Sequence, residues 1–205
     1  MCSSMADLLM PKLINLLSSL LQRVAESNDL NRSLDTQKLS IFNALVRPGI
    51  SIQQYLERIF KYANCSPSCY VVAYVYLDRF VKKQPLLPIN SFNVHRLLVA
   101  SVLVSIKFMD DICYNNAYYA KVGGISTAEM NLLEVDFLFG LGFQLNVTPN
   151  TFYDYCMYLQ TEMMTGLTGF PPVCSPPPVP TIGADHCSIN DDDCQSQHHQ
   201  PQLAV

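Results

Sequence analysis

The chain has 205 residues, of which 49% are hydrophobic, so it can bury the core of one domain and still leave room for a tail. Its formal net charge is −4, which argues against a general nucleic-acid binder, because such a protein needs a basic surface. Eight cysteines occur without a CxxC pair, which indicates free thiols inside the cell rather than a disulfide framework. No stretch approaches the roughly 20 apolar residues of a membrane span, so we expect no membrane partner.

The first predicted element is an N-terminal amphipathic helix over residues 1–29. Apolar residues recur in it at helical spacing: Leu13, Leu16, Leu17, Leu20 and Val24. The run KLINLLSSLL at 12–21 could instead be the apolar part of a secretory signal, but no Ala-x-Ala cleavage site follows it. We therefore expect a helix that docks on a core.

The second and third predicted helices span 51–64 and 67–83. The buried face of the second is predicted to hold Ile52, Tyr55, Leu56, Ile59 and Phe60. The stretch VVAYVYLDRF at 71–80 has the composition of a buried strand, but it belongs to a 17-residue segment without internal Gly or Pro. That segment opens with Ser66-Pro67, an N-cap followed by proline at the first helical position, and it ends in two lysines. Its length favours a helix that is buried on most of its circumference.

The remaining pattern predicts helices at 91–110, 115–122, 127–142 and 149–164. Within the first of these, LLVASVLVSI is apolar on every side, which is typical of a central helix surrounded by protein. Gly123-Gly124 ends the next helix, and STAE at 126–129 is a capping box that starts the one after it. No alternation of strands and helices appears, so the predicted class is all-α.

The composition changes after Gly166. Six prolines lie between 171 and 180, and DDD and HH follow. Such a segment cannot bury enough apolar surface to offset its chain entropy, so we predict a Pro-rich disordered tail over 167–205. The cysteines and histidines of this tail fit no zinc module, and we predict no metal site.

Two charged residues stand in apolar surroundings. Lys107 ends the central helix, and Glu134 borders the apolar stripe of the helix at 127–142. Leaving either charge desolvated without a partner is costly. The two residues could form an internal salt bridge, or they could flank an exposed apolar surface that binds a partner helix, and spacing does not decide between these alternatives.

Asp78 and Arg79 end the strand-like stretch. Adjacent residues on a helix point about 100° apart, so one of the two is expected to face inward. A buried Asp78 needs a cation, which Arg58 or Arg47 could supply, and we predict a structural ion pair that clamps one helix to its neighbour.

The sequence shows no sign of catalysis. It has no serine elbow, phosphate-binding loop or nucleophile motif, and three of its four histidines lie in the tail. The fourth, His95, is predicted to be a surface or capping group. We expect no enzyme activity, no cofactor and no small-molecule substrate.

Three stretches in order, VVAYVYLDRF, RLLVASVLVSIKF and LLEVDFLFGLGFQL, resemble the cyclin box. The segment ISIQQYLERIFKYANCSPSCYVVAYVYLDRF resembles the plant U-type, or P-type, group of phosphate-regulator-like cyclins. The resemblance implies a single five-helix cyclin box over 30–145, with the N-terminal helix before it and an additional helix at 146–166.

The resemblance also implies roles for particular residues. The lysine and glutamate of cyclins that match Lys107 and Glu134 contact a kinase, and the positions of Phe108 and Leu138 add apolar contact. Asp78 matches a structural aspartate. The first box helix, however, reads SIQQYLERIF where most cell-cycle cyclins carry Met-Arg-Ala-Ile-Leu, so substrate docking there and an arginine partner for Asp78 are both in question.

The sequence therefore predicts a regulatory subunit that binds and activates a cyclin-dependent serine/threonine protein kinase, A-type in plants. ATP and Mg²⁺ would belong to that partner. The alternative is a non-activating helical adaptor, or a cyclin-like binding module, although the acidic charge disfavours the version that reads nucleic acid. We expect an intracellular location, in the nucleus, the cytoplasm or both.

Overall fold

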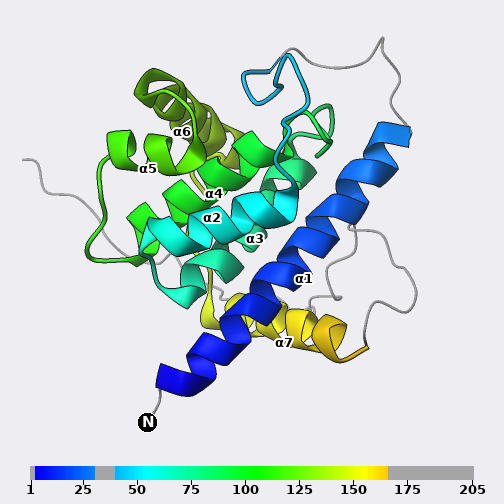
Figure 1. Cartoon of the computed structure of the whole chain (residues 1–205), viewed down its shortest axis with the longest axis vertical. Helices are drawn as coiled ribbons and strands as arrows, with labels where there is room; N and C mark the ends of the chain where they lie inside the picture. The colour runs from blue at the N-terminus through cyan, green and yellow to red at the C-terminus, as the bar shows by residue number, and fades with distance from the viewer. Residues whose placement is uncertain (1–2, 31–39, 166–205) are drawn as a thin grey trace, which may run out of the picture. The chain divides into compact units, whose positions relative to one another are not determined.

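The computed structural model describes residues 3–30 and 40–165, which form helices and no strand (Figure 1). The helices are α1 (Ser3–Leu30), α2 (Ile52–Ala63), α3 (Pro67–Lys83), α4 (Val94–Met109), α5 (Asn116–Gly123), α6 (Thr127–Leu141) and α7 (Pro149–Thr165). The all-α class is confirmed. The predicted bounds of α3 agree with the structure, and the start of α4 differs by three residues, 94 instead of 91. The tail predicted over 167–205 lies outside the described residues.

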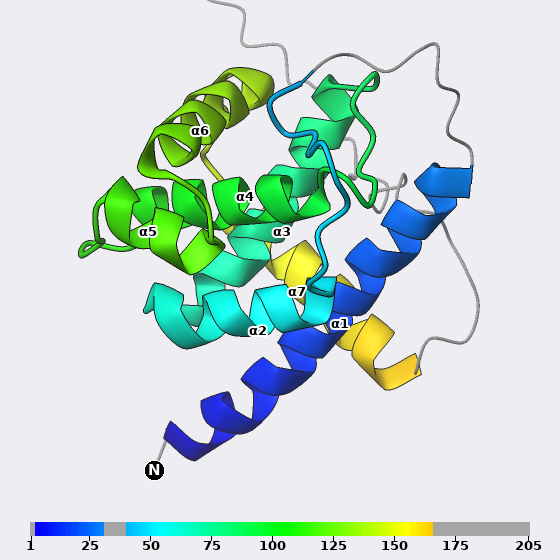
Figure 2. The same ribbon diagram turned by 45° about the horizontal axis from the view of Figure 1, so that its top comes forward.

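Helix α4 is the central element, as its all-round apolar pattern predicts. Every residue from Leu97 to Ile106 is buried, and α2, α3, α5 and α6 all contact the helix (Figures 1 and 2). Its two buried serines do not leave unsatisfied hydroxyls, since Ser101 Oγ donates to the carbonyl of Leu98 and Ser105 Oγ to that of Val102, both at 2.8 Å. Small side chains with internally satisfied hydroxyls let the neighbouring helices approach closely.

Helix α3 is the main partner of α4, and it contains the strand-like stretch. Its residues from Cys69 to Leu77 are all buried, so the helix is surrounded on most of its circumference. Ser66 occupies the predicted N-cap position, but its hydroxyl makes no capping hydrogen bond. Instead, the backbone N–H of Ser66 donates to the Asp110 carboxylate at the end of α4, at 3.0 Å. The start of α3 is thereby tied to the end of its main packing partner.

Local capping chemistry sets several helix ends. Ser126 Oγ accepts from the backbone N–H of Glu129 at 3.1 Å, as the STAE motif predicts, but the Glu129 side chain bonds Arg96 on α4 and leaves the box half complete. A complete capping box joins Ser51 and Gln54 at the start of α2. Gly124, with φ of +71°, ends α5 in the left-handed conformation that favours glycine.

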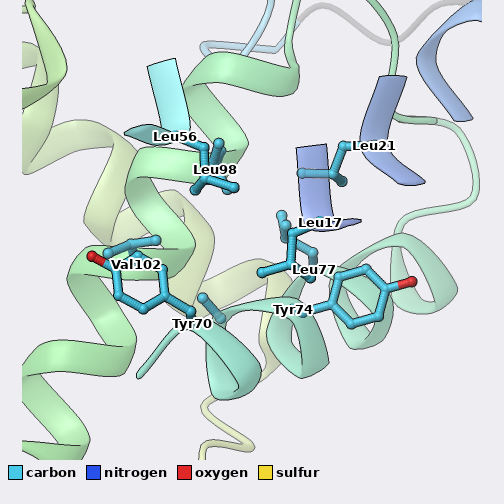
Figure 3. A pocket seen from close by; sticks show the side chains of 9 residues that line it. Leu17, Leu21, Leu56, Tyr70, Tyr74, Leu77, Leu98 and Val102 are labelled. Atoms are coloured by element: carbon cyan, nitrogen blue, oxygen red, sulfur yellow. The ribbon is translucent and has the colours of Figure 1, made fainter. Parts of the chain in front are cut away.

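Helix α1 lies against α2 and α7 (Figure 2). Its side chains Leu17 and Leu21 face Tyr74 and Leu77 of α3 around a void of only about 10 Å³ (Figure 3). Leu20 is also buried, whereas the predicted contacts Leu13 and Val24 are only half-buried. The N-terminal helix therefore completes the core, as its amphipathic pattern predicts. Of the described helices, none is long and apolar enough to span a membrane.

The buried face of α2 differs from the prediction at one position. Ile52, Tyr55, Leu56 and Ile59 are buried. Phe60, however, is 40% exposed, and its ring meets that of Tyr70 in an edge-on arrangement with centroids 5.9 Å apart. Phe60 follows Ile59 by one residue and so points away from the centre of the buried stripe, which explains the error.

A cluster of aromatic rings joins α3 to α6. Phe80 of α3 stacks on Phe137 of α6 with ring centroids 4.9 Å apart, and Phe42 meets Phe80 edge-on at 5.4 Å. Gly140 makes this packing possible, because a Cβ at that position would lie 2.2 Å from the Phe80 ring. The α3–α6 contact thus depends on a glycine inside a helix, where glycine is intrinsically unfavourable.

We predict that Gly140→Ala lowers the free energy of unfolding by about 1–3 kcal/mol, because the added methyl group overpacks the aromatic cluster. Gly49→Ala is the matched control, since a Cβ there meets no atom within 4 Å; its change should stay within about 1 kcal/mol. Urea denaturation of both variants checks this. Equal free energies of unfolding of the two variants would show that the aromatic cluster accommodates the added methyl group without loss of stability.

Candidate functional site

Lys107 and Glu134 meet on the surface where α4 leaves the core. Ile106 is fully buried, and the next residue, Lys107, brings its ammonium group to solvent in the last turn of α4. Lys107 Nζ lies 2.6 Å from Glu134 Oε1 on α6, and the two side chains are 34% and 15% exposed. The fold therefore joins two residues that are 27 positions apart in an ion pair that is only partly hydrated.

Asn116, the first residue of α5, fixes the other side of this carboxylate. Its Nδ2 donates to Glu134 Oε2 at 2.6 Å and to Asn131 Oδ1 at 2.7 Å. The sequence gives no signal for this role, because Asn115-Asn116 reads as a helix start, and Asn115 does provide the N-cap. Both oxygens of Glu134 are thus engaged, and the carboxylate is held in one orientation.

Exposed apolar side chains lie next to the pair along both helices. Phe108 and Met109 directly follow Lys107, and Val135 directly follows Glu134; all three side chains are exposed. We call these three residues the α4–α6 apolar surface. Phe108, a predicted contact residue, is 48% exposed, whereas Leu138 is half-buried and packs against the core, so it offers less area than expected. Apolar side chains around a partly desolvated charged pair are typical of a protein-binding surface.

The ion pair retains hydrogen-bonding capacity. Lys107 carries three N–H donors, of which one is directed at Glu134. The carboxylate can accept further hydrogen bonds besides those from Lys107 and Asn116. Among residues 3–30 and 40–165, no group of three or more His, Cys, Asp or Glu side chains could hold a metal ion.

Asp78 is structural, but the partner expected from the sequence is wrong. Lys82, one turn later on α3, donates to Asp78 Oδ2 at 2.6 Å, and the Tyr155 hydroxyl of α7 donates to the same oxygen at 2.6 Å. Arg58 instead donates to the carbonyl of Lys121. The pKa of the Tyr155 hydroxyl is raised well above its ordinary value, mainly because the group is buried and secondly because it donates to Asp78.

The ion pair of Asp78 lies within α3, so it does not clamp two helices together as predicted, and Arg79 contacts a different part of the chain. Its Nη1 donates to the carbonyls of Gln144 and Asn146, both at 2.9 Å, in the segment between α6 and α7. The adjacent charges on α3 therefore hold different parts of the chain, Asp78 the helix α7 and Arg79 the connection that leads to it.

His95 is a packing residue rather than the predicted surface or capping group. Its ring is half-buried, meets the Tyr55 ring edge-on at 5.0 Å, and places Nε2 3.0 Å from the carbonyl oxygen of Ile50. Burial lowers the pKa of the imidazole, so the neutral ring is favoured. The sequence could not predict this contact, because the periodicity of one helix does not show which loop residues pack against it.

The helices packed around α4 form an all-helical module with a charged pair at the end of its central helix. A sequence model of the family described as Cyclin matches residues 11–145. The chain belongs to the cyclin family, whose members are regulatory proteins with a protein kinase as partner. The matched range begins inside α1, so it includes most of that helix.

More closely, the chain is a U-type or P-type plant cyclin, as the sequence resemblance implied. It is 65% identical over 199 residues to Cyclin-U4-1 of Arabidopsis thaliana, which covers 96% of each chain. It is 54% identical over 193 residues to Cyclin-P4-1 of Oryza sativa subsp. japonica, which covers 92% of this chain and 87% of that relative.

We predict that Tyr155→Phe lowers the free energy of unfolding by about 1–2 kcal/mol, because a hydrogen bond to a charged group contributes more than a neutral one. Tyr153→Phe, on the same helix and 63% exposed, should change it by less than about 0.5 kcal/mol. Thermal and urea unfolding measure both. If the two variants behaved alike, the Asp78–Tyr155 contact would not hold α7 in solution.

Proposed function

We propose that this cyclin binds a cyclin-dependent serine/threonine protein kinase through Lys107 and Glu134, with Phe108 and Leu138 adding apolar contact, and that binding activates the kinase. The observation that carries the proposal is a Lys107–Glu134 pair held at 2.6 Å beside the exposed α4–α6 apolar surface. An A-type kinase of plants is the partner we propose, in keeping with the plant relatives.

The pair is suited to this role because it is already ordered. Lys107 and Asn116 hold the Glu134 carboxylate from two sides, so less side-chain entropy is lost when a partner arrives. Charge-assisted hydrogen bonds gain strength when a partner excludes water from them. The apolar surface supplies the water-excluding contacts around such a centre.

Activation would follow from differential binding. The cyclin would press on the mobile C helix of the kinase and favour the state in which the kinase Lys–Glu pair and activation loop are arranged for catalysis. To move a kinase from 1:99 to 99:1 in favour of that state, the cyclin must bind it more tightly by about 5.5 kcal/mol. This chain performs no chemistry in the proposal; ATP and Mg²⁺ are bound by the kinase.

A purely structural role for the pair is the competing explanation. Exposed salt bridges contribute only about 0–1 kcal/mol to stability, so loss of either residue should leave the fold intact. The chain provides a matched control in Arg96–Glu129, a pair at 2.6 Å that also joins α4 to α6 and has comparable exposure.

We predict that Lys107→Ala and Glu134→Ala each weaken kinase binding at least tenfold, while Arg96→Ala and Glu129→Ala change it less than twofold. Calorimetric titration of the purified kinase measures the affinity, and thermal unfolding confirms that all four variants fold. Wild-type affinity in both Lys107→Ala and Glu134→Ala would refute the proposed site.

A charge-swapped double variant, Lys107→Glu with Glu134→Lys, separates the two explanations further. It restores an intramolecular ion pair but presents the opposite charges to the kinase. We expect stability close to wild type and at least tenfold weaker kinase binding. Recovery of full binding in the swapped variant would mean that the pair acts only within the cyclin.

Activation itself needs its own measurement. Purified kinase should phosphorylate a peptide substrate at least tenfold faster with the wild-type cyclin than without it. If the complex forms but the rate does not rise, the chain is a non-activating adaptor.

Substitution of Asn116 tests whether the fixed orientation of the Glu134 carboxylate contributes to kinase binding. We expect Asn116→Ala to weaken kinase binding three- to tenfold, because Glu134 loses one of its two restraints. Asn131→Ala removes only the second acceptor of Asn116 and serves as the control, with an effect below twofold. Equal affinities of the two variants would show that Lys107 alone orients the carboxylate.

We also propose an intracellular location, in the nucleus, the cytoplasm or both. Support comes from the free thiols of Cys65, Cys69, Cys113 and Cys156, which are typical of a reducing compartment. Imaging of a fluorescent fusion in plant cells tests this location.

A further inference from the structure

Two free thiols lie together at the start of α3. Cys65 directly precedes the N-cap residue Ser66, and Cys69 lies in the first turn of the helix. Cys69 is fully buried, whereas Cys65 is half-buried. The Ser66 hydroxyl lies 3.3 Å from the Cys69 sulfur, and the thiols of Cys65 and Cys69 are in hydrogen-bonding contact with each other. The pair therefore combines one thiol that solvent reaches with one that the fold shields.

The surroundings of Cys65 favour its thiolate form. The pKa of Cys65 is lowered, mainly because the Cys69 thiol donates a hydrogen bond to it, although burial opposes this shift. The hydroxyl of Tyr70, a buried residue, donates a second hydrogen bond. The N-terminus of α3 adds positive electrostatic potential beside the sulfur. Because the thiolate is the nucleophilic form of cysteine, Cys65 is the more reactive of the two thiols.

The same contact keeps the proton on Cys69. The pKa of the Cys69 thiol is raised, first because of its hydrogen bond with Cys65 and secondly because the group is buried. The Ser66 hydroxyl acts in the opposite direction. When the Cys65 sulfur is oxidised, the thiolate that retains this proton is removed, and Ser66 is still in place to stabilise a thiolate at Cys69. The two sulfurs are therefore suited to react one after the other.

The backbone between the two thiols is held in place. The N–H of Ser66 donates to the Asp110 carboxylate at the end of α4, at 3.0 Å. Pro67, the first residue of α3, fixes its own φ angle. Because only three residues separate the cysteines and their backbone is already ordered, little chain entropy is lost when the sulfurs are brought together.

We propose that Cys65 and Cys69 form a peroxide-reactive pair, which hydrogen peroxide converts into an intrachain disulfide. The Cys65 thiolate attacks one oxygen of the peroxide, the O–O bond breaks, hydroxide leaves, and a sulfenic acid remains on Cys65. Cys69 then attacks this sulfur, the S–S bond forms, the S–O bond breaks, and the leaving oxygen takes up the thiol proton as water. The two sulfurs lose two electrons in total, and the peroxide is reduced to water.

The thiol pair does not use the proposed kinase contacts. Lys107, Phe108, Glu134 and Leu138 take no part in its chemistry, so the two proposals can fail separately. Inside a cell, the thiol pool would return the disulfide to the dithiol, because intracellular disulfides are usually transient. The pair would therefore respond reversibly to peroxide.

Peptide mapping of the full chain tests the inference. Trypsin cleaves after Lys and Arg, so the peptide 62–79 contains Cys65 and Cys69 as its only cysteines, and the peptide 108–121 contains only Cys113. The reduced, folded chain is treated with hydrogen peroxide, alkylated with iodoacetamide in urea and digested. Peptide 62–79 should lose both alkyl groups and the mass of two hydrogen atoms. This loss should be at least tenfold faster than the loss of alkylation at the exposed Cys113.

Two variants separate the roles of the thiols. Cys69→Ala should leave a sulfenic acid on Cys65, which dimedone traps in the peptide 62–79. Cys65→Ala should leave Cys69 reduced, because burial shields it from peroxide. Thermal unfolding checks that both variants fold, and the mapping of the wild-type chain tests the pair without either variant.

Three results would overturn the inference. Cys65 and Cys113 could lose alkylation at the same rate in the folded wild-type chain. Peptide 62–79 could become linked to 108–121 instead of closing on itself, which would assign the oxidation to a different pair. Cys69 could be oxidised as fast in a folded Cys65→Ala variant as in the wild type, which would show that Cys65 does not react first.

Discussion

Burial of α4 on all sides is the constraint on which the rest of the structure depends. An apolar helix of this kind gains stability only when other helices remove its whole circumference from water. Helices α2, α3, α5 and α6 contact α4, and its two buried serines bond to carbonyls of the helix itself. The positions of Lys107 and Phe108 follow from where this central helix ends.

The end of α4 is where the packed core meets the proposed kinase-binding site. After the buried Ile106 the helix must return to solvent, and Lys107 with Phe108 is the first part to do so. The lysine finds a carboxylate on α6, and Asn116 of α5 holds that carboxylate in turn, so three helices converge on one charged centre. Such a centre is ordered by the fold yet keeps hydrogen-bonding capacity and apolar neighbours, which is the combination that the proposed kinase contact requires.

Helix α6 presents different side chains at its two outer edges. One edge presents Glu134 towards α4 and α5, while the other presents Asp136 and Phe139 towards α3 and the segment before α2. Its inner face buries Met130, Leu133 and Phe137 without exception. Because Gly140 lets Phe80 of α3 approach closely, the inner packing also sets how α6 lies against α3. Core packing and the arrangement of the exposed side chains are therefore coupled along a single helix.

Local sequence patterns determined the helices, since apolar periodicity, capping residues and glycine terminators act over a few residues. They also singled out Lys107, Glu134 and Asp78, because a charge in an apolar run demands an explanation. Only the tertiary structure decided which groups meet. Asp78 contacts Lys82 and Tyr155 rather than an arginine. Glu134 is bonded by Asn116, and His95 lies against the loop carbonyl of Ile50. Those contacts depend on the rotation and crossing of whole helices and on the paths of loops, which are set by the summed packing of the core and leave no periodic trace in any one segment.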